Sequence, residues 1–173
     1  GASDVTAFAG LNGGKSNAIG LSLSQLSFAL ALMSDKSNSA RKFTALQATA
    51  GSVGFIGVDG ITISSDTVEV KINQSNTNDV VDFATSPLDI VVGTGTTITL
   101  DMDGSVGKYL EATGNFNVNI FNFFSVSGGF AIEKTSDTVT LDDASDVDVD
   151  LLTLGASGVE AFVGINGGSA DAL

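Results

Sequence analysis

The chain has 173 residues, with 20 Asp and Glu against 7 Lys and Arg, a net charge of −13, and neither His nor Cys. Without His and Cys it cannot form a Ser-His-Asp or Cys-His catalytic arrangement, a disulfide or a Cys-ligated metal site, and we expect no enzyme. The acidic charge repels phosphate, so nucleic acid is a poor partner, whereas divalent cations are attracted. No apolar run reaches the roughly 18 residues of a membrane helix, and we expect no membrane insertion.

Apolar and polar residues alternate with a period of two along most of the chain, which predicts β-strands. In chain order the clearest segments are 21–28 with a break of phase before Leu26, 68–73, 98–102, 116–126 with a bulge near Phe121–Phe124, and 138–141. Only the segment 39–50 has apolar residues at helical spacing, so a helix is the alternative there. The predicted fold class is all-β, an antiparallel meander forming an elongated sandwich, a roll or a solenoid-like repeat module.

Turns are predicted where Gly, Asn and Asp cluster. The pattern Phe-x-Gly-aliphatic-Asn/Asp-Gly occurs at 8–13, 55–60 and 162–167, and it predicts a strand end followed by a tight turn. Its first Gly lies two residues after Phe on the same strand face and leaves space beside the ring. Further turns are predicted at Ser65-Asp66, 93–95, Asp103-Gly104, Gly128-Gly129 and Ser136-Asp137.

The two ends of the sequence resemble each other. Residues 1–19 and 155–173, aligned without gaps, match at 11 of 19 positions, and the second copy starts 154 residues after the first. We therefore expect residues 1–154 to be one full repeat of a tandem array and residues 155–173 to start the next repeat. The alternative is a pseudo-symmetric domain whose two ends pair with each other. In an array, the last strand of one module can pair with the first strand of the next and cover its edge.

Two groups of aspartates are candidate metal ligands. Asp146, Asp148 and Asp150 alternate with valine, so their carboxylates share one face of a strand, where a bound cation would relieve their repulsion. Asp101 and Asp103, followed by Gly104, match part of a calcium loop. Ca²⁺ is the candidate cofactor. The alternatives are a solvated charged face for the first group and a plain Asp-Gly turn for the second.

Five segments carry a resemblance in repeat style that extends over essentially the whole chain. They are Phe28–Lys36, Arg41–Leu46 with Ala48–Ala50, Phe55–Gly60, Gly128–Lys134, and Leu154–Gly158 with its Asn-Gly-Gly turn. In these segments the chain resembles tandem repeat modules of very large secreted or surface proteins, adhesin-like, from marine and other environmental bacteria. The resemblance implies an extracellular or bacterial cell-surface location and a family that often has Ca²⁺-binding regions. The glycine-rich nonapeptide of calcium β-rolls is absent from this chain.

Together these features lead us to expect a non-enzymatic structural or adhesive repeat module. Its expected partners are neighbouring repeats of the same chain or like chains, with which it extends or self-associates into a fibre or matrix. The alternative is a binding module that holds a lipid or another apolar ligand against the Phe-rich strands. Core packing is the other expected role of those rings, which are Phe116, Phe121, Phe123, Phe124 and Phe130.

Overall fold

A computed structural model describes residues 1–165, and antiparallel strands dominate this range. The strands are β1 (Ala2–Leu11), β2 (Ile19–Ser34), β3 (Lys42–Ala50), β4 (Ser52–Ile56), β5 (Ile61–Ser75), β6 (Leu88–Gly93), β7 (Thr96–Leu100), β8 (Tyr109–Ile120), β9 (Phe124–Thr140) and β10 (Asp146–Val163). A single 3₁₀ turn, η1 (Gly104–Val106), precedes β8. The predicted all-β, antiparallel meander is confirmed.

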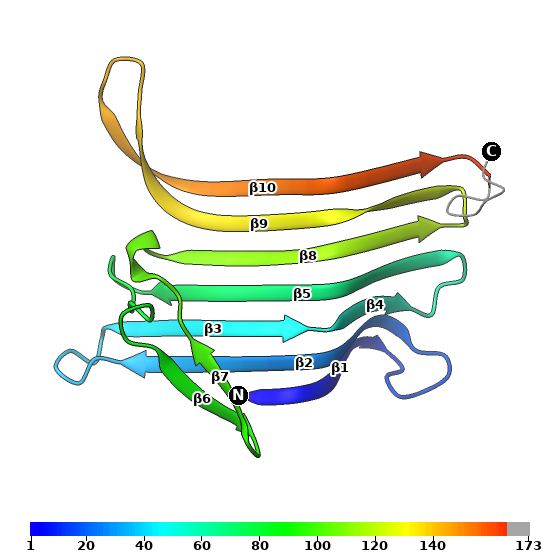
Figure 1. Ribbon diagram of the computed structural model, residues 1–173, viewed down its shortest axis with the longest axis horizontal. Helices are drawn as coiled ribbons and strands as arrows, with labels where there is room; N and C mark the ends of the chain where they lie inside the picture. The colour runs from blue at the N-terminus through cyan, green and yellow to red at the C-terminus, as the bar shows by residue number, and fades with distance from the viewer. Residues whose placement is uncertain (166–173) are drawn as a thin grey trace.

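One large open sheet forms most of the molecule (Figure 1). Its strand order is β1-β2-β3-β5-β8-β9-β10, and β4 continues the line of β3 between β2 and β5. The strands β1 and β10 are the two edges, so the N-terminus and the end of the described chain lie at opposite sides of the sheet. The hairpin of β9 and β10 is longer than its neighbours, and its tip projects beyond the sheet.

A second, two-stranded sheet of β6 and β7 lies across one face of the large sheet, over β2 and β3. The core lies beneath it, because small side chains on β2 and β3 allow the hairpin to approach closely. The buried cluster consists of Ala29, Ala31, Ala45, Phe83, Val92, Leu100, Met102 and Tyr109. Asn73 is also buried there, and its Nδ2 donates a hydrogen bond to the Val81 carbonyl (2.8 Å).

Tyr109 connects this core to the pH dependence of stability. Burial, followed by the negative charges of Glu111 and Asp101, raises the pKa of Tyr109 to about 12. In the unfolded chain the hydroxyl of this tyrosine has a pKa near 10. Unfolding therefore releases its proton when the pH lies between 10 and 12. Stability should therefore be unaffected by this group below pH 10 and should fall as the pH rises from 10 to 12. Urea denaturation across this range should show a steeper loss than in Tyr109→Phe, and equal slopes would contradict the assignment.

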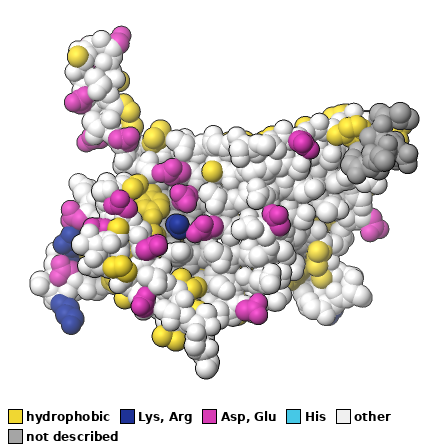
Figure 2. Space-filling view, viewed as in Figure 1, with side chains coloured by type: hydrophobic (Ala, Val, Ile, Leu, Met, Phe, Trp, Pro, Cys, Tyr) yellow, Lys and Arg dark blue, Asp and Glu magenta, His cyan; other side chains and the backbone are white. Residues whose placement is uncertain are grey.

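The two faces of the large sheet differ in polarity. The face under the hairpin, here called the hairpin face, carries a polar row formed by Gln47, Lys71, Glu111, Glu133 and Thr153 on adjacent strands. Figure 2 views this face, where acidic side chains are scattered over a largely uncharged surface. The alternate residues point to the opposite, apolar face. Two rows of this apolar face are Phe28, Ala48, Val70, Ala112, Ile132 and Leu154, and Leu30, Leu46, Ile72 and Leu110.

Several predicted turns are present. The loop after β1 has Asn12 and Gly14 at positive φ, and the Lys15 amide donates to the Asn12 carbonyl (3.0 Å). Between β4 and β5 the Ile61 amide donates to the Val58 carbonyl (3.3 Å), with Gly60 at φ 76°. Only Gly60 of the Asp59-Gly60 pair has a positive φ, which is the pattern of a type II turn. The Asn166-Gly167 turn lies outside the described residues.

Valine at either of two positive-φ turn positions should destabilise the fold. Asn12→Val places a β-branched residue at φ 56°, and Gly60→Val does so at φ 76°, where its Cβ would also lie 2.2 Å from the Phe121 ring. We expect a loss of about 1–3 kcal/mol in the free energy of unfolding for each. Thermal melts should show both variants below the parent, whereas Asn12→Gly should melt close to it. Unchanged melts of both valine variants would contradict these turn assignments.

The helical alternative for the segment 39–50 is not observed, because residues 42–50 form β3, paired with β2 and β5 on its two sides. The predicted turns at Ser65-Asp66, Gly128-Gly129 and Ser136-Asp137 lie within strands. At Asp66 an extra residue forms a bulge opposite β8, and Gly128 leaves room for Val159 of β10, whose Cγ2 would lie 2.9 Å from a Cβ at this position.

The segment around Phe121 is a turn and not the predicted bulge. Phe121 and Asn122 both have positive φ, and the Phe123 amide donates to the Ile120 carbonyl (2.9 Å). This hairpin turn joins β8 to β9. It also leaves Phe121 and Phe123 largely exposed, so the expected core role does not hold for them. Phe116 and Phe130 instead pack edge to face on the apolar face, with ring centroids 6.1 Å apart.

Candidate functional site at the sheet edges

The three aspartates of β10 lie in the projecting hairpin, here called the acidic arm (residues 137–150). Each of them is directly opposite a hydroxyl side chain of β9 and accepts a hydrogen bond from it. The bonds are Thr140 Oγ1 to Asp146 (2.8 Å), Thr138 Oγ1 to Asp148 (2.8 Å) and Ser136 Oγ to Asp150 (3.1 Å). This ladder satisfies one oxygen of each carboxylate, so the Asp-Val alternation has a structural role in pairing the arm.

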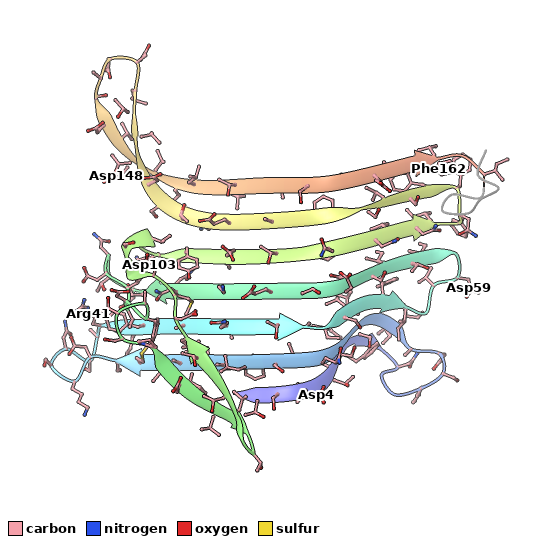
Figure 3. All side chains as sticks on the ribbon, viewed as in Figure 1. Asp4, Arg41, Asp59, Asp103, Asp148 and Phe162 are labelled. Atoms are coloured by element: carbon pink, nitrogen blue, oxygen red, sulfur yellow. The ribbon has the colours of Figure 1, made fainter. Side chains whose placement is uncertain are left out.

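Asp101 and Asp103 lie elsewhere, in the segment between β7 and η1. Met102 between them is buried in the core, so the two aspartates point outward. Asp103 Oδ1 accepts a hydrogen bond from the Ser105 amide (2.8 Å) and caps η1. Figure 3 shows Asp103 and Asp148 on separate elements, although both are at the end of the sheet away from Asp59 and Phe162.

Across residues 1–165, no three acidic side chains come together as a metal site of carboxylates would require.

Calcium binding by the aspartates stays a prediction, and it has a direct test. Calcium bound between the carboxylates of Asp146, Asp148 and Asp150 should raise the melting temperature in millimolar CaCl₂ by mass action. The control is NaCl of equal ionic strength, because screening alone relieves repulsion in so acidic a chain. The triple Asp→Asn variant should lose the calcium response, and an equal shift in both salts would contradict binding.

One aspartate that the sequence did not single out organises the loops beside the core. Asp82 Oδ2 accepts a hydrogen bond from Thr85 Oγ1 (2.6 Å), and Asp82 Oδ1 accepts one from the Gly104 amide (3.2 Å). The Thr85 hydroxyl, and then the Gly104 amide, lower the pKa of Asp82. The carboxylate therefore ties the loop before β6 to η1. Nothing in the local spacing indicates this bond, since the two loops are far apart in the sequence.

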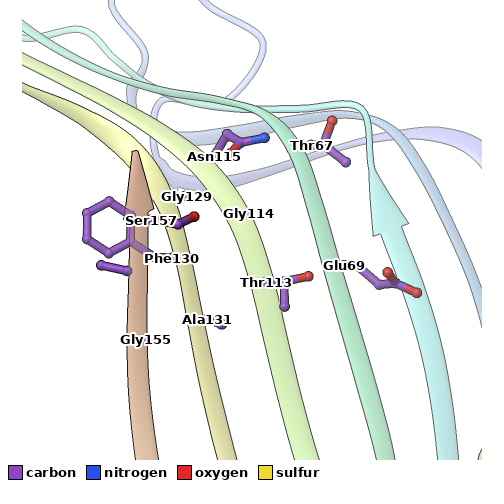
Figure 4. A pocket seen from close by; sticks show the side chains of 11 residues that line it. Thr67, Glu69, Thr113, Gly114, Asn115, Gly129, Phe130, Ala131, Gly155 and Ser157 are labelled. Carbon is purple, nitrogen blue, oxygen red and sulfur yellow. The ribbon is translucent and has the colours of Figure 1, made fainter. Parts of the chain in front are cut away.

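A shallow hollow crosses β5, β8, β9 and β10 on the hairpin face (Figure 4). It exists because small residues lie side by side in two adjacent rows. One row holds Glu69, Thr113, Ala131 and Gly155, and the other holds Thr67, Asn115, Gly129 and Ser157. Glu69 is the only ionisable residue among those that line the hollow. Its carboxylate lies 3.2 Å from Lys71 Nζ in an ion pair, and no second carboxylate lines the hollow to form the pair of a general acid and a general base.

The two edge strands share an unusual feature. The segment 155–163, the copy of residues 1–9, forms the second half of β10. Gly158 has φ 57°, and its counterpart 154 residues earlier, Asp4 in β1, has φ 50°. Each lies at a one-residue register shift, between Ser157 and Glu160 in the β9–β10 pairing and between Ala2 and Val5 in the β1–β2 pairing. The two copies therefore have the same bulge at the same position.

The edges also lack partners. Among residues 1–165, β10 pairs only with β9, and β1 pairs only with β2. The part of β2 beyond Phe28 extends past the end of β1 and pairs only with β3. Exposed strand edges of this length invite pairing with another strand.

Comparisons with known proteins identify no relative. No family model matches the chain, and no curated protein and no solved structure does so either. Among the described residues, no helix is long and apolar enough to cross a bilayer.

Proposed function

We propose that this chain is a non-enzymatic structural repeat whose sheet continues from one repeat into the next. The observation that carries the proposal is the bulge shared by Asp4 in β1 and Gly158 in β10. A left-handed residue is rare in a strand, and for Asp it carries a conformational cost. Its recurrence after one sequence period supports the view that 155–163 is the first strand of the next repeat.

The strand count supports the same proposal. From β1 to β9 the sheet has six strand positions, if β3 and β4 are taken as one line. An even number keeps the antiparallel alternation, so β10 runs in the same direction as β1. The strand after β10 in a continued sheet would run like β2. Because β1 and β10 lie on opposite edges, a further repeat can be added at one edge while the other edge stays open for the next repeat.

The remaining parts of the proposal rest on chemistry and resemblance. The hollow on the hairpin face offers one carboxylate, which supports a non-enzymatic role. The acidic arm projects into solvent, and its carboxylates would keep neighbouring fibres apart by charge repulsion. An extracellular or bacterial cell-surface location and an adhesive role follow from the resemblance to adhesin-like repeat modules.

The test is a tandem protein in which residues 1–154 are followed by residues 1–173. At the junction, residues 1–9 of the second repeat take the place of 155–163, so their amides should exchange slowly toward both neighbours, β9 of the first repeat and β2 of the second. In the described part of the 173-residue chain, β1 pairs only with β2 and is the control, because its other set of amides has no strand partner. Junction amides that face β9 but exchange as fast as the outward amides of β1 in the 173-residue chain would overturn the proposal.

A second function, binding of a lipid or another apolar ligand, is favoured by the apolar face. Over the described residues the large sheet is a single layer outside the hairpin, and nothing covers its apolar rows. Leu30, Ile132 and Leu154 are exposed on this face. An acyl chain lying across these rows would remove apolar surface from water at about 25 cal/mol per Å².

Lipid binding is tested on the purified chain. Organic extraction followed by mass spectrometry should recover lipid, and a fluorescent apolar probe should bind to the delipidated protein. Val70→Asn, in the middle of the apolar face, should reduce probe binding, whereas the matched change Glu69→Gln on the hairpin face should not. A chain free of lipid that binds no probe would contradict this function.

A further inference from the structure

Pairs of exposed leucines lie on the two opposite edges of the sheet. On β2, Leu30 and Leu32 are 41% and 73% exposed, and on β10, Leu152 and Leu154 are 70% and 71% exposed. All four point to the apolar face. Each lies just beyond the bulged, repeated part of its edge: the β2 pair past the end of β1, and the β10 pair before Gly155.

The internal repeat fixes how these two edges would meet. Ala2 lies opposite Phe28 in the β1–β2 pairing, and Ala156 is the counterpart of Ala2. If 155–163 occupied the β1 position on a second copy, Ala156 would lie opposite Phe28 of that copy. In an antiparallel pair, two residues back on one strand correspond to two residues forward on the other. Leu154 would then lie opposite Leu30, and Leu152 opposite Leu32.

The same register continues into the acidic arm. Asp150 would lie opposite Ser34 of the second copy, while on its other side it already accepts a hydrogen bond from Ser136. In this register leucine lies opposite leucine at two positions. The carboxylate of Asp150 would lie opposite the Ser34 hydroxyl, as it lies opposite the Ser136 hydroxyl within one chain. The register was set by the repeat alone, without reference to these side chains, so their match is an independent observation.

We propose that separate copies of this chain associate head to tail, with Gly155–Val163 of one copy replacing β1 on the β2 edge of the next. The proposal rests on the proposed function, because it uses the joint between repeats, and it names a second copy of the chain as the partner. The exchange replaces residues 1–9 with a copy that is identical at six of nine positions and has the same bulge, so little pairing is lost. The two leucine contacts exist only in the exchanged state and favour it.

Charge opposes this association. Each copy has a net charge of −13, so copies repel one another at low ionic strength. Association should thus increase with NaCl at fixed protein concentration. Because donor and acceptor edges differ, each bound copy leaves one edge free, and the expected species form a ladder of oligomers instead of a closed symmetric dimer.

Engineered cysteines test the register, since the chain has no cysteine of its own. Single variants are mixed in pairs under mild oxidation: Leu154→Cys with Leu30→Cys, and Leu152→Cys with Leu32→Cys. Paired residues on adjacent strands have Cα atoms about 4.5–5.5 Å apart, within disulfide range. The off-register mixtures, Leu154→Cys with Leu32→Cys and Leu152→Cys with Leu30→Cys, are matched controls. Their Cα atoms would be about 7–8 Å apart, which is too far for a disulfide.

Mixed dimers in both in-register pairs, with only single-variant background in the off-register pairs, are the expected result. Equal yields in all four mixtures would indicate random collision and overturn the proposal. Single variants that form disulfide dimers alone would also overturn it, because they indicate symmetric pairing of identical edges.

The same cysteine pair placed across the junction of the tandem protein separates the association of copies from the proposed function. If Leu154→Cys bonds to Leu30→Cys of the second repeat there but not between separate chains, the proposed function stands and the association of copies fails.

Discussion

Replacing Phe83 with alanine should lower the free energy of unfolding by about 3–5 kcal/mol. Phe83 is 2% exposed and belongs to the buried cluster that includes alanines of β2 and β3 and residues of the β6–β7 hairpin. Within residues 1–165, this is the one place where two layers of strands enclose buried side chains. The cavity left by the ring would be lined by Leu100, Met102 and small alanines, whose backbones are fixed by the sheet and cannot collapse into it.

The control for Phe83 is another phenylalanine that lies outside this core. Phe123 is largely exposed after the β8–β9 turn, so Phe123→Ala should cost well under half as much. Urea denaturation followed by far-ultraviolet circular dichroism measures both. A similar loss in the two variants would mean that the hairpin does not stabilise the sheet.

Much of the fold could be predicted from the sequence because strands on two-sided sheets show a period of two. The break of phase before Leu26 was visible for the same reason, and it corresponds to Gln25 at φ 52°. The segment 39–50 also allowed a helix because alanine is common on both faces of β3. Ala45 fits beneath the hairpin and Ala48 lies on the apolar face, so strand alternation is hidden.

The sequence shows where the glycines are, but it does not distinguish a glycine in a turn from a glycine inside a strand. Gly60 and Gly14 are in turns, as predicted, whereas Gly128 and Gly129 lie in the middle of β9. A Cβ at Gly128 would lie 2.9 Å from Val159 Cγ2 in the bulged part of β10, and a Cβ at Gly114 would lie 3.1 Å from the Phe116 ring, so these glycines make room for side chains of the sheet. Whether a glycine bends the chain or accommodates a side chain depends on the neighbouring strand, which local sequence does not identify.

The candidate site was partly predictable. The repeat identified 155–163 as a copy of the first strand, but its pairing with β9 depends on contacts between distant segments. The aspartates of the acidic arm were placed correctly on one strand face. The hydroxyl ladder that pairs with them was missed, although Ser136, Thr138 and Thr140 have the same period of two and could have indicated it.

Gly57→Ala should be the most costly glycine substitution at a strand end. Gly57 has φ 89°, and a Cβ there would lie 2.0 Å from the Ala18 carbonyl oxygen and 2.8 Å from the Ile19 Cα. Both obstacles are backbone, so relief requires β4 to separate from the start of β2. The left-handed conformation itself costs alanine roughly 1–2 kcal/mol, and the forced shift typically adds about 1–3 kcal/mol.

Gly54→Ala, inside β4 and three residues before Gly57, is the matched control. Its Cβ would meet only the Ile63 carbonyl oxygen, at an ordinary 3.7 Å, and its φ is not left-handed. The control should therefore be neutral or slightly stabilising, because alanine reduces the freedom of the unfolded chain. Urea denaturation of the two variants should separate them by about 2 kcal/mol or more. Similar midpoints would mean that β4 and the start of β2 do not approach as closely as the structure requires.

The first Gly of the repeated Phe-x-Gly motif has the same role at Gly10, where a Cβ would lie 2.2 Å from the Ile19 carbonyl oxygen. At both positions the end of a strand therefore lies very close to a neighbouring backbone. This close approach explains why the motif has glycine there.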